Sequence, residues 1–429
     1  MINSSRRSRC PLVLFAVMFL TAVLLFPSTR ARASSESDPV IRILLSVGIT
    51  SRVEMQIGGS YECFGSRFTG GILYIEADGT ELRVRHSTMG LLGSGTSAEI
   101  KPADDAAGLS LNNSVYGERK YLGSITCSLS QENVLRVVNT VGINEYLYGV
   151  LDAELSDDTN PEALKARAVA AKCYALSCRN SVRSFDISDR DIEVSYTGFN
   201  PGHTNIIAAV DEVSQNLLLS GGTVTRCYCC TSNGGYTILP SMRWDSRADQ
   251  DVSYASRFDP FDLEYAQTAV FQNIDADISK MNNALYNILI LKASGENISS
   301  MDSIVSVNSI QDFNGLSGSN MESDTAEPAY MSLTVACTLW NGTAKYLSFL
   351  IPLSELFEKQ IIQAPDANVC YVLQTGSETW TVICSRKIGH RVGMSKYGML
   401  QRAESGQTYD QILSFYYPGA ELVKAKKIA

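Results

Sequence analysis

The strongest secondary-structure signal in this sequence is an alanine-rich helix predicted from Pro161 to about Cys178. Asn160 is a residue type favoured at the N-cap, and proline is favoured at the first helical position because it has no N–H to leave unsatisfied. A shorter amphipathic helix is predicted just before it, from Asn144 to about Ala153. Any fold of this chain must therefore accommodate a helical patch over residues 140–180.

Strand-like segments flank this patch on both sides. From residue 40 to about 139, short apolar stretches alternate with turn signals such as Asp78-Gly79, which predicts a meander of strands. Residues 220–385 alternate in the same way, and residues 386–420 hold a histidine-containing loop and two short helices. We therefore expect an α+β fold in which strand-rich lobes surround the helical patch, with residues 40–420 as one domain.

The first 33 residues are typical of an export signal. Arg6, Arg7 and Arg9 precede an apolar run from Pro11 to Pro27, and Ala31-Arg32-Ala33 offers the small residues of a cleavage site. The run lies at the short end of the roughly 17 to 25 residues that span a bilayer as a helix. We expect a retained signal anchor that holds an exported protein at the cell membrane. Cleavage after Ala33, which would give a secreted protein, is the alternative.

The charge of the exported part limits its partners. Residues 1–33 contain five arginines and no acids, so removing them from a chain of net charge −9 leaves −14. Such a surface argues against nucleic acid or anionic lipid as a partner. A neutral or weakly charged polymer such as a sugar strand remains compatible.

Glu154 is a candidate general acid. It ends the short first helix and follows apolar residues, among them Val150 and Leu151, so its carboxyl could be partly desolvated. Partial desolvation raises the pKa of a carboxyl toward the pH at which a general acid operates. A solvated glutamate at a helix end explains the same spacing.

Lys165 and Lys172 lie seven residues apart on the alanine-rich helix, on one stripe with Ala168 between them. The small alanines would let a ligand approach while the two ammonium groups project at its edges. A solvated lysine face is the alternative.

Two glycine-containing segments are further candidates for a binding site. Residues 228–235 read Tyr-Cys-Cys-Thr-Ser-Asn-Gly-Gly, where paired glycines permit a tight turn and polar side chains could bind a sugar. A plain hairpin turn explains this segment equally well. Residues 389–398 place His390, one of three histidines, between glycines in a loop that leads into a helix. The flanking glycines could hold the imidazole in the fixed orientation that a binding or catalytic role needs. A purely structural histidine is the alternative.

Together these segments resemble the family of stage II sporulation protein D and the amidase enhancers. In that family, patterns like E-Y-L-x-G-V-V-x-x-E, E-A-L-K-A-Q-A-V-A-A-R-T-Y-A, S-T-S-G-G, G-H-G-V-G-M-S-Q-x-G-A and Y-x-x-I-L-x-x-Y-Y-P-G follow in this order. The corresponding segments here are 145–154, 162–175, 231–235, 389–398 and 409–419. Several motifs in the right order, within residues 40–420, make the resemblance more specific than any one of them.

The resemblance implies lytic transglycosylation, the cleavage of the bond after N-acetylmuramic acid that leaves a 1,6-anhydro end. Ordinary glycoside hydrolysis uses two carboxylates, whereas here one is enough because the sugar's own 6-hydroxyl is the nucleophile. Glu154 would be the acid and then the base. The setting implied is cell-wall remodelling, with sporulation engulfment as one form of it and a cell-wall amidase as a partner. The residues expected to contact the glycan are Lys165, Lys172, Tyr174, Tyr228, Ser232, Asn233, Gly234, Gly235, His390, Ser395 and Tyr397.

The sequence departs from the family patterns at several site positions. Arg167 and Lys396 each stand where the pattern has glutamine, Lys172-Cys173 replaces Arg-Thr, and Arg391 replaces a glycine beside the histidine. An arginine at position 391 could narrow the cleft or change the preferred glycan. Some family members carry a Cys/His zinc site after the long helix, but residues 184–203 contain no cysteine, so no metal and no other cofactor is expected.

Two other functions compete with the transglycosylase. A non-catalytic glycan-binding module that enhances or recruits an amidase would keep the fold and the turn motifs without using Glu154. A cysteine hydrolase would use Cys229 or Cys230 with His390. The remaining cysteines are scattered, which is typical of small buried hydrophobic residues.

Overall fold

The computed structural model describes residues 39–130, 134–265 and 388–425, together with parts of 270–385 that are mainly strands. The export segment predicted over residues 1–33 lies outside the described residues. Among the helices in the described part of the chain, none is both long enough and apolar enough to cross a bilayer.

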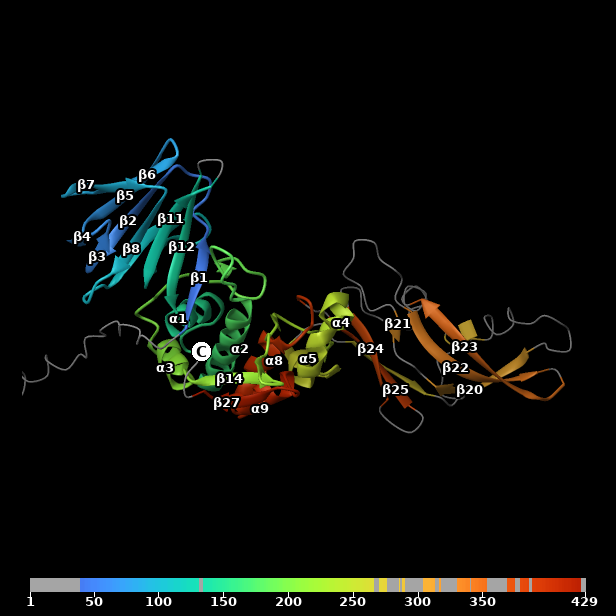
Figure 1. The fold of residues 1–429 in the computed structure, drawn as a ribbon. Coiled ribbons are helices and arrows are strands. Elements are labelled where there is room, and N and C mark those ends of the chain that lie inside the picture. The colour runs from blue at the N-terminus through green and yellow to red at the C-terminus, as the bar shows by residue number, and fades with distance from the viewer. Residues whose placement is uncertain are drawn as a thin grey trace, which may run out of the picture.

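The first lobe consists of two antiparallel sheets that pack against each other (Figure 1). Buried and exposed residues alternate along their strands, as in β2 (Arg52–Gly58) and β6 (Glu81–His86). This alternation places one face of each sheet in a common core. The other strands are β1 (Val40–Leu45), β3 (Ser60–Cys63), β4 (Ser66–Thr69), β5 (Ile72–Asp78), β7 (Gly90–Gly95), β8 (Ser97–Pro102), β9 (Gly108–Asn113), β10 (Gly117–Tyr121), β11 (Ser124–Leu129) and β12 (Leu135–Gly142).

The helical patch follows directly from β12. Helix α1 spans Ile143–Glu154 and helix α2 spans Pro161–Cys178, so the two helices predicted here are confirmed. Asn160 caps α2 by accepting a hydrogen bond from the Glu162 N–H at 3.0 Å. After α2 the chain returns to the first lobe, where β13 (Ile187–Ser188) runs parallel to β1.

Helix α2 is the centre of the second lobe. Elements packed around it are α1, α3 (Thr204–Glu212), β14 (Asn216–Ser220), β15 (Thr223–Val224), α8 (Lys396–Glu404) and α9 (Tyr409–Tyr416). Twelve of its eighteen residues are buried, and half of these are alanines. The alanines are therefore explained by close approach of neighbours on every side, not by a ligand on one face.

The C-terminal part of the chain closes this lobe. Strand β27 (Glu421–Lys424) pairs with β14, and β26 (Met394–Ser395) runs parallel to β16 (Cys229–Cys230). From β16 to residue 265 the chain forms, in order, β17 (Tyr236–Thr237), α4 (Pro240–Arg243), the 3₁₀ helix η1 (Asp245–Ser253), β18 (Arg257–Phe258) and α5 (Pro260–Tyr265). Segments more than 150 residues apart in sequence thus meet beside α2.

Further strands lie beyond α4 and α5, on the side away from the first lobe (Figure 1). One sheet orders them β19-β25-β24 and another β20-β22-β21, with β23 paired to β22. Their bounds are β19 (Val270–Asp275), β20 (Ile304–Asp312), β21 (Leu316–Ser317), β22 (Tyr330–Leu339), β23 (Ala344–Pro352), β24 (Val369–Gln374) and β25 (Thr379–Ser385). The described chain therefore has the mixed α+β character that the sequence predicts.

Candidate functional site

A cavity of about 490 Å³ opens where α1, α2, the 191–195 segment, β16 and the 389–399 segment meet. It brings Glu154 together with residues of two other predicted motifs. Its lining residues are Ala153, Glu154, Leu155, Arg167, Asp191, Ile192, Glu193, Val194, Ser195, Cys229, Cys230, Thr231, Arg243, Gly389, His390, Met394, Lys396 and Met399.

Glu154 is the last residue of α1, and its side chain is 21% exposed to the cavity. Both carboxylate oxygens accept from Arg167: Nε lies 2.6 Å from Oε2 and Nη2 lies 2.8 Å from Oε1. The main-chain carbonyl of Glu154, which has no partner within the helix, accepts from Nζ of Lys396 at 2.6 Å. Two cations from two other helices thus fix the position of this glutamate.

Arg167 is buried beneath the cavity and contacts more than Glu154. Its Nη1 lies 3.2 Å from the sulfur of Cys229, and its Nη2 also donates to the main-chain carbonyl of Glu193 at 3.0 Å. Several acceptors therefore surround a guanidinium that burial alone would make unfavourable.

His390 is held in one orientation by two hydrogen bonds. Its Nε2 lies 3.0 Å from a carboxylate oxygen of Glu193, and its Nδ1 accepts from the Val392 N–H at 3.1 Å. Because Nδ1 accepts a main-chain N–H, the proton of the neutral ring is on Nε2 and is donated to Glu193. Glu193 also accepts from the Cys229 N–H at 2.9 Å, so it joins the histidine loop to β16.

Two glycines shape the histidine loop. Gly389 has φ +106° and Gly393 has φ +72°, both in the region that side chains disfavour. A Cβ on Gly393 would lie 2.1 Å from the carbonyl oxygen of Tyr228. The ring of His390 packs against Trp244 at 5.1 Å and Tyr228 at 6.2 Å between centroids. The loop is therefore fixed by close packing on both sides.

Comparisons with known proteins agree with this arrangement of motifs. The family model for stage II sporulation proteins matches residues 131–219, the segment that contains Glu154, Arg167 and Glu193. The chain is 27% identical to the amidase enhancer of Bacillus subtilis (strain 168) over 291 residues, and 22% identical to stage II sporulation protein D of the same organism over 306 residues. Residues 131–219 therefore resemble the stage II sporulation proteins, and the longer matches extend this similarity to the amidase enhancer and to stage II sporulation protein D.

The extent of these matches differs between relatives. The match to the amidase enhancer covers 64% of this chain but only 40% of that relative, so the chain spans two fifths of its length. The match to stage II sporulation protein D covers 67% of this chain and 76% of the relative. An uncharacterized protein of Brachyspira hyodysenteriae (strain ATCC 49526 / WA1) is 25% identical over 313 residues, which cover 72% of this chain and 74% of that protein.

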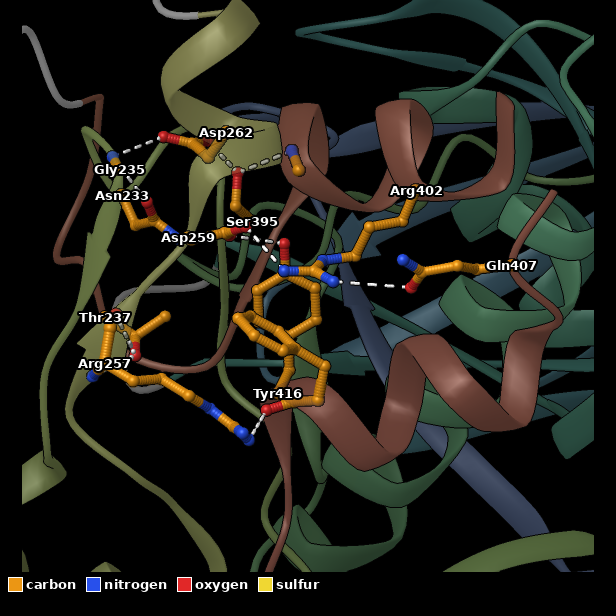
Figure 2. Close-up of polar contacts among 12 residues, drawn as sticks. Asn233, Gly235, Thr237, Arg257, Asp259, Asp262, Ser395, Arg402, Gln407 and Tyr416 are labelled. Carbon is orange, nitrogen blue, oxygen red and sulfur yellow. Dashed lines mark hydrogen bonds and ion pairs between the residues drawn. The ribbon is translucent and has the colours of Figure 1, made fainter. Parts of the chain in front are cut away.

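The glycine turn of this family has a structural role here, which corrects the expectation that it contacts a sugar. Ser232 and Asn233 are buried and donate to Asp262 and Asp259, each at 2.9 Å. Figure 2 shows Asn233 beside Asp259. The Gly235 N–H donates to Asp262 at 2.9 Å and to the side chain of Asn233 at 2.8 Å. Gly234 likewise donates to the Ser232 hydroxyl at 3.2 Å.

Asp259 and Asp262, which flank the start of α5, organise this buried network. Ser395 is fully buried and donates to Asp262, and Arg402 donates to Asp259 at 2.8 Å (Figure 2). Burial raises the pKa of Asp262, although the hydrogen bond from Ser395 acts in the opposite direction. The network joins α5 to α8 and so supports the cavity wall without lining it.

The two lysines of α2 lie away from the cavity, which corrects the expectation that they line the cleft. Lys172 is fully buried, and its Nζ donates to the carbonyls of Val213 at 2.8 Å and Ser214 at 2.7 Å. Lys165 pairs with Glu162 at 3.0 Å and Glu212 at 2.7 Å. Both lysines therefore fasten α2 to its neighbours.

The tyrosines expected at the glycan also lie outside the cavity lining. Tyr174 is buried and donates to Asp191 at 2.9 Å, and Tyr228 is buried and donates to Gln250 at 2.8 Å. Tyr397 is half-buried, and its N–H donates to the Thr231 carbonyl at 3.2 Å. Tyr174 and Tyr228 reach the site only through Asp191 and the ring of His390.

Arg391 does not narrow the cleft. It has φ +68°, is 8% exposed, and directs its Nε to the Tyr236 carbonyl at 3.2 Å. It occupies the left-handed conformation for which the family pattern uses glycine. The substitution therefore changes the loop's support on the side of β17 and leaves the cavity wall to His390.

The geometry argues against a cysteine hydrolase. Both ring nitrogens of His390 are occupied by Glu193 and Val392, so no imidazole nitrogen is available to a thiol. Burial raises the pKa of the Cys229 thiol to about 11, even though Arg167 lowers it, and burial also raises the pKa of Cys230. A thiol with a raised pKa is a poor nucleophile at neutral pH.

The described residues also contain a site residue that the sequence did not single out. Glu193 has no motif of its own in the pattern quoted above, and only the meeting of its segment with the histidine loop reveals it. Within the described part of the chain, no group of three or more His, Cys, Asp or Glu residues is arranged to hold a metal ion.

Proposed function

We propose that this chain cuts the glycan strands of peptidoglycan as a lytic transglycosylase, with Glu154 as its acid and base. The observation that carries this proposal is the convergence in one cavity of Glu154, the strand Cys229–Cys230 and the loop of His390. Glu154, His390 and Thr231, which follows that strand and also lines the cavity, come from separate motifs of the family, and Glu154 presents a partly exposed carboxylate at that point.

The reaction needs one carboxyl group at the scissile bond. Protonated Glu154 gives its proton to the glycosidic oxygen, and the bond from C1 of the muramic acid to that oxygen breaks. The Glu154 carboxylate then takes the proton of the 6-hydroxyl while the 6-hydroxyl oxygen bonds to C1 and closes the anhydro ring. Glu154 ends the cycle protonated, and no water is consumed.

The charges around the cavity are compatible with a polymer of low charge. Arg167, Arg243 and Lys396 balance Glu154, Asp191 and Glu193 among the lining residues. Sugar hydroxyls and acetamido groups can hydrogen-bond to either sign of charge. We therefore propose uncharged sugar units as the part of the substrate that enters here.

A second candidate is a glycan-binding module that enhances a cell-wall amidase without cutting the strand. It is favoured by the relative named amidase enhancer and by the position of Glu154, whose oxygens are both engaged by Arg167. Under this proposal the cavity binds a strand, and the amidase is the partner.

We further propose that residues 1–33 export the protein and anchor it to the cell membrane, where it would face the cell wall. This rests on the arginines before the apolar run from Pro11 to Pro27. Wall remodelling, as in engulfment during sporulation, is the setting that the family suggests.

The test is to incubate the purified full-length protein with peptide-free glycan strands and to analyse the products by mass spectrometry. Glu154→Gln is the active-site variant, and Glu404→Gln, an exposed glutamate on α8, is the matched control. Anhydro-ended fragments from the wild type and Glu404→Gln, but not from Glu154→Gln, are expected. Strand binding without cleavage by any of the three would favour the amidase enhancer instead.

A further inference from the structure

Two departures from the family pattern converge on one residue. Arg167 and Lys396 each replace glutamine, they come from α2 and α8, and both contact Glu154. Where the pattern places two neutral amides, this chain places two basic side chains. The contacts differ, because Arg167 binds the carboxylate and Lys396 binds the main-chain carbonyl.

The fork between Arg167 and Glu154 holds the side chain as a carboxylate. Each oxygen accepts a short hydrogen bond from the guanidinium, at 2.6 and 2.8 Å. A bidentate pair of this kind needs both oxygens as acceptors. In this arrangement neither oxygen carries a proton for a glycosidic oxygen.

Arg167 is the fixed member of the pair. Only 5% of its side chain is exposed, and its remaining contacts are with the sulfur of Cys229 and the carbonyl of Glu193. Glu154 is at the end of its helix and is 21% exposed. Lys396 restrains the main chain of Glu154, so only its side-chain torsions are available for movement.

From these contacts we infer that Arg167 is a positioning residue that sets the working state of Glu154. Arg167 holds Glu154 against α2 as a carboxylate. Glu154 can act as a general acid only when one of its oxygens moves away from the guanidinium and takes up a proton. The inference rests on the proposed function in that the acid acts on a glycan bond. The state of Glu154 itself can be measured without any reaction.

Other titratable or charged groups face the same cavity and must be kept constant in the test. They are Asp191, Glu193, Cys229, Arg243, His390 and Lys396, and the buried Tyr146 lies within electrostatic reach of Glu154. Arg167 is the partner to change, because both carboxylate oxygens of Glu154 accept hydrogen bonds from it.

The experiment compares the full-length wild type with Arg167→Gln, which restores the family residue and offers at most one or two amide hydrogens to Glu154. Arg179→Gln is the matched control, because Arg179 is exposed at the end of the same helix. Arg167→Lys keeps a charge but not the fork. Circular dichroism establishes that each variant is folded.

Two readouts are made on each protein. The first is the side-chain carboxyl ¹³C resonance of Glu154, identified by its loss in Glu154→Gln and followed from about pH 3 to 8. The second is the pH profile of strand cleavage, with kcat and KM measured separately. Neither a change in the resonance nor a change in the profile would follow from a purely structural role.

We expect the pH dependence of the Glu154 resonance to differ between Arg167→Gln and the wild type, because the fork that holds both carboxylate oxygens is lost, with Arg167→Lys between them. The alkaline limit of kcat is expected to move with it, and Arg179→Gln is expected to match the wild type. Should the resonance stay where it is in a folded Arg167→Gln or Arg167→Lys, the inference is overturned. A resonance that moves in proteins that cut no strand would retain the inference and reject the transglycosylase.

Discussion

Replacing Lys172 by methionine removes a buried charge that joins α2 to the end of α3. Its Nζ donates to the Val213 and Ser214 carbonyls at 2.8 and 2.7 Å, and the residue is fully buried. The Val213 carbonyl keeps a second partner, the Asn216 N–H at 2.9 Å, whereas in the described part of the chain Lys172 is the one donor to the Ser214 carbonyl. The substitution removes two hydrogen bonds from a charged donor and leaves the Ser214 carbonyl without a partner, which predicts a decrease of at least about 2 to 3 kcal/mol in the free energy of unfolding.

Lys165→Met is the control on the same helix. Lys165 makes ion pairs with Glu162 and Glu212, and the side chain of Glu212 is 61% exposed, so the loss is expected to stay below about 1 kcal/mol. Urea denaturation followed by circular dichroism measures both values. Neither variant is expected to weaken strand binding. An unchanged free energy of unfolding for Lys172→Met, together with weaker strand binding, would refute this reasoning and return Lys172 to the cleft.

Three other substitutions or modifications test the loop and the thiol. Gly393→Ala is expected to lower the free energy of unfolding by more than about 2 kcal/mol and to reduce strand cleavage, because its Cβ would lie 2.1 Å from the Tyr228 carbonyl oxygen. Gly406→Ala is the control, because Gly406 also has a positive φ but lies in open space, and it is expected to lower the free energy of unfolding by about 1 to 2 kcal/mol in the same denaturation assay. Because the pKa of Cys229 is raised to about 11, little of its thiol is ionised at neutral pH. Iodoacetamide is therefore expected to label Cys229 about a hundredfold more slowly than a free thiol, and faster as the pH rises. Rapid labelling at neutral pH, together with loss of activity, would support the cysteine hydrolase instead. Arg391→Gly is expected to leave the pattern of cleavage products unchanged, since the arginine is directed away from the cavity, and an altered pattern in mass spectrometry would contradict that placement.

The sequence predicted the local structure around the site well. Asn160 and Pro161 identified the start of α2, and the ends of α1 and α8 also agree with the pattern. These features depend on neighbouring residues in the chain, such as caps and periodic apolar positions. The prediction that Glu154 and His390 belong to one site is compatible with the cavity that both residues line.

The contacts of individual side chains could not be predicted in the same way. The spacing of Lys165 and Lys172 is compatible with an exposed stripe, but α2 is enclosed by other helices and by β14, and its contact with α9 joins residues 247 positions apart. The sequence predicts an exposed polar turn at Ser232 and Asn233. Their burial could not be predicted, because their partners Asp259 and Asp262 lie in a segment with no recognised motif. Glu193 could not be predicted as a site residue for the same reason. Burial of polar groups depends on partners supplied by tertiary packing.

The role of Arg167 illustrates the point from the opposite side. The sequence marks it only as a departure from glutamine, and the structure assigns it a buried fork on Glu154. A departure from a family pattern therefore gains meaning from the residue that it contacts. Here that residue is the one on which the proposed chemistry depends.

The most direct test of that chemistry is to digest peptide-free glycan strands in ¹⁸O-labelled water with the wild type and with Glu154→Gln, and to measure the new ends by mass spectrometry. We predict anhydro ends from the wild type, each lighter by one water than a hydrolysed end and free of ¹⁸O, and no new ends from Glu154→Gln. New ends that carry ¹⁸O, or equal cleavage by Glu154→Gln, would contradict it.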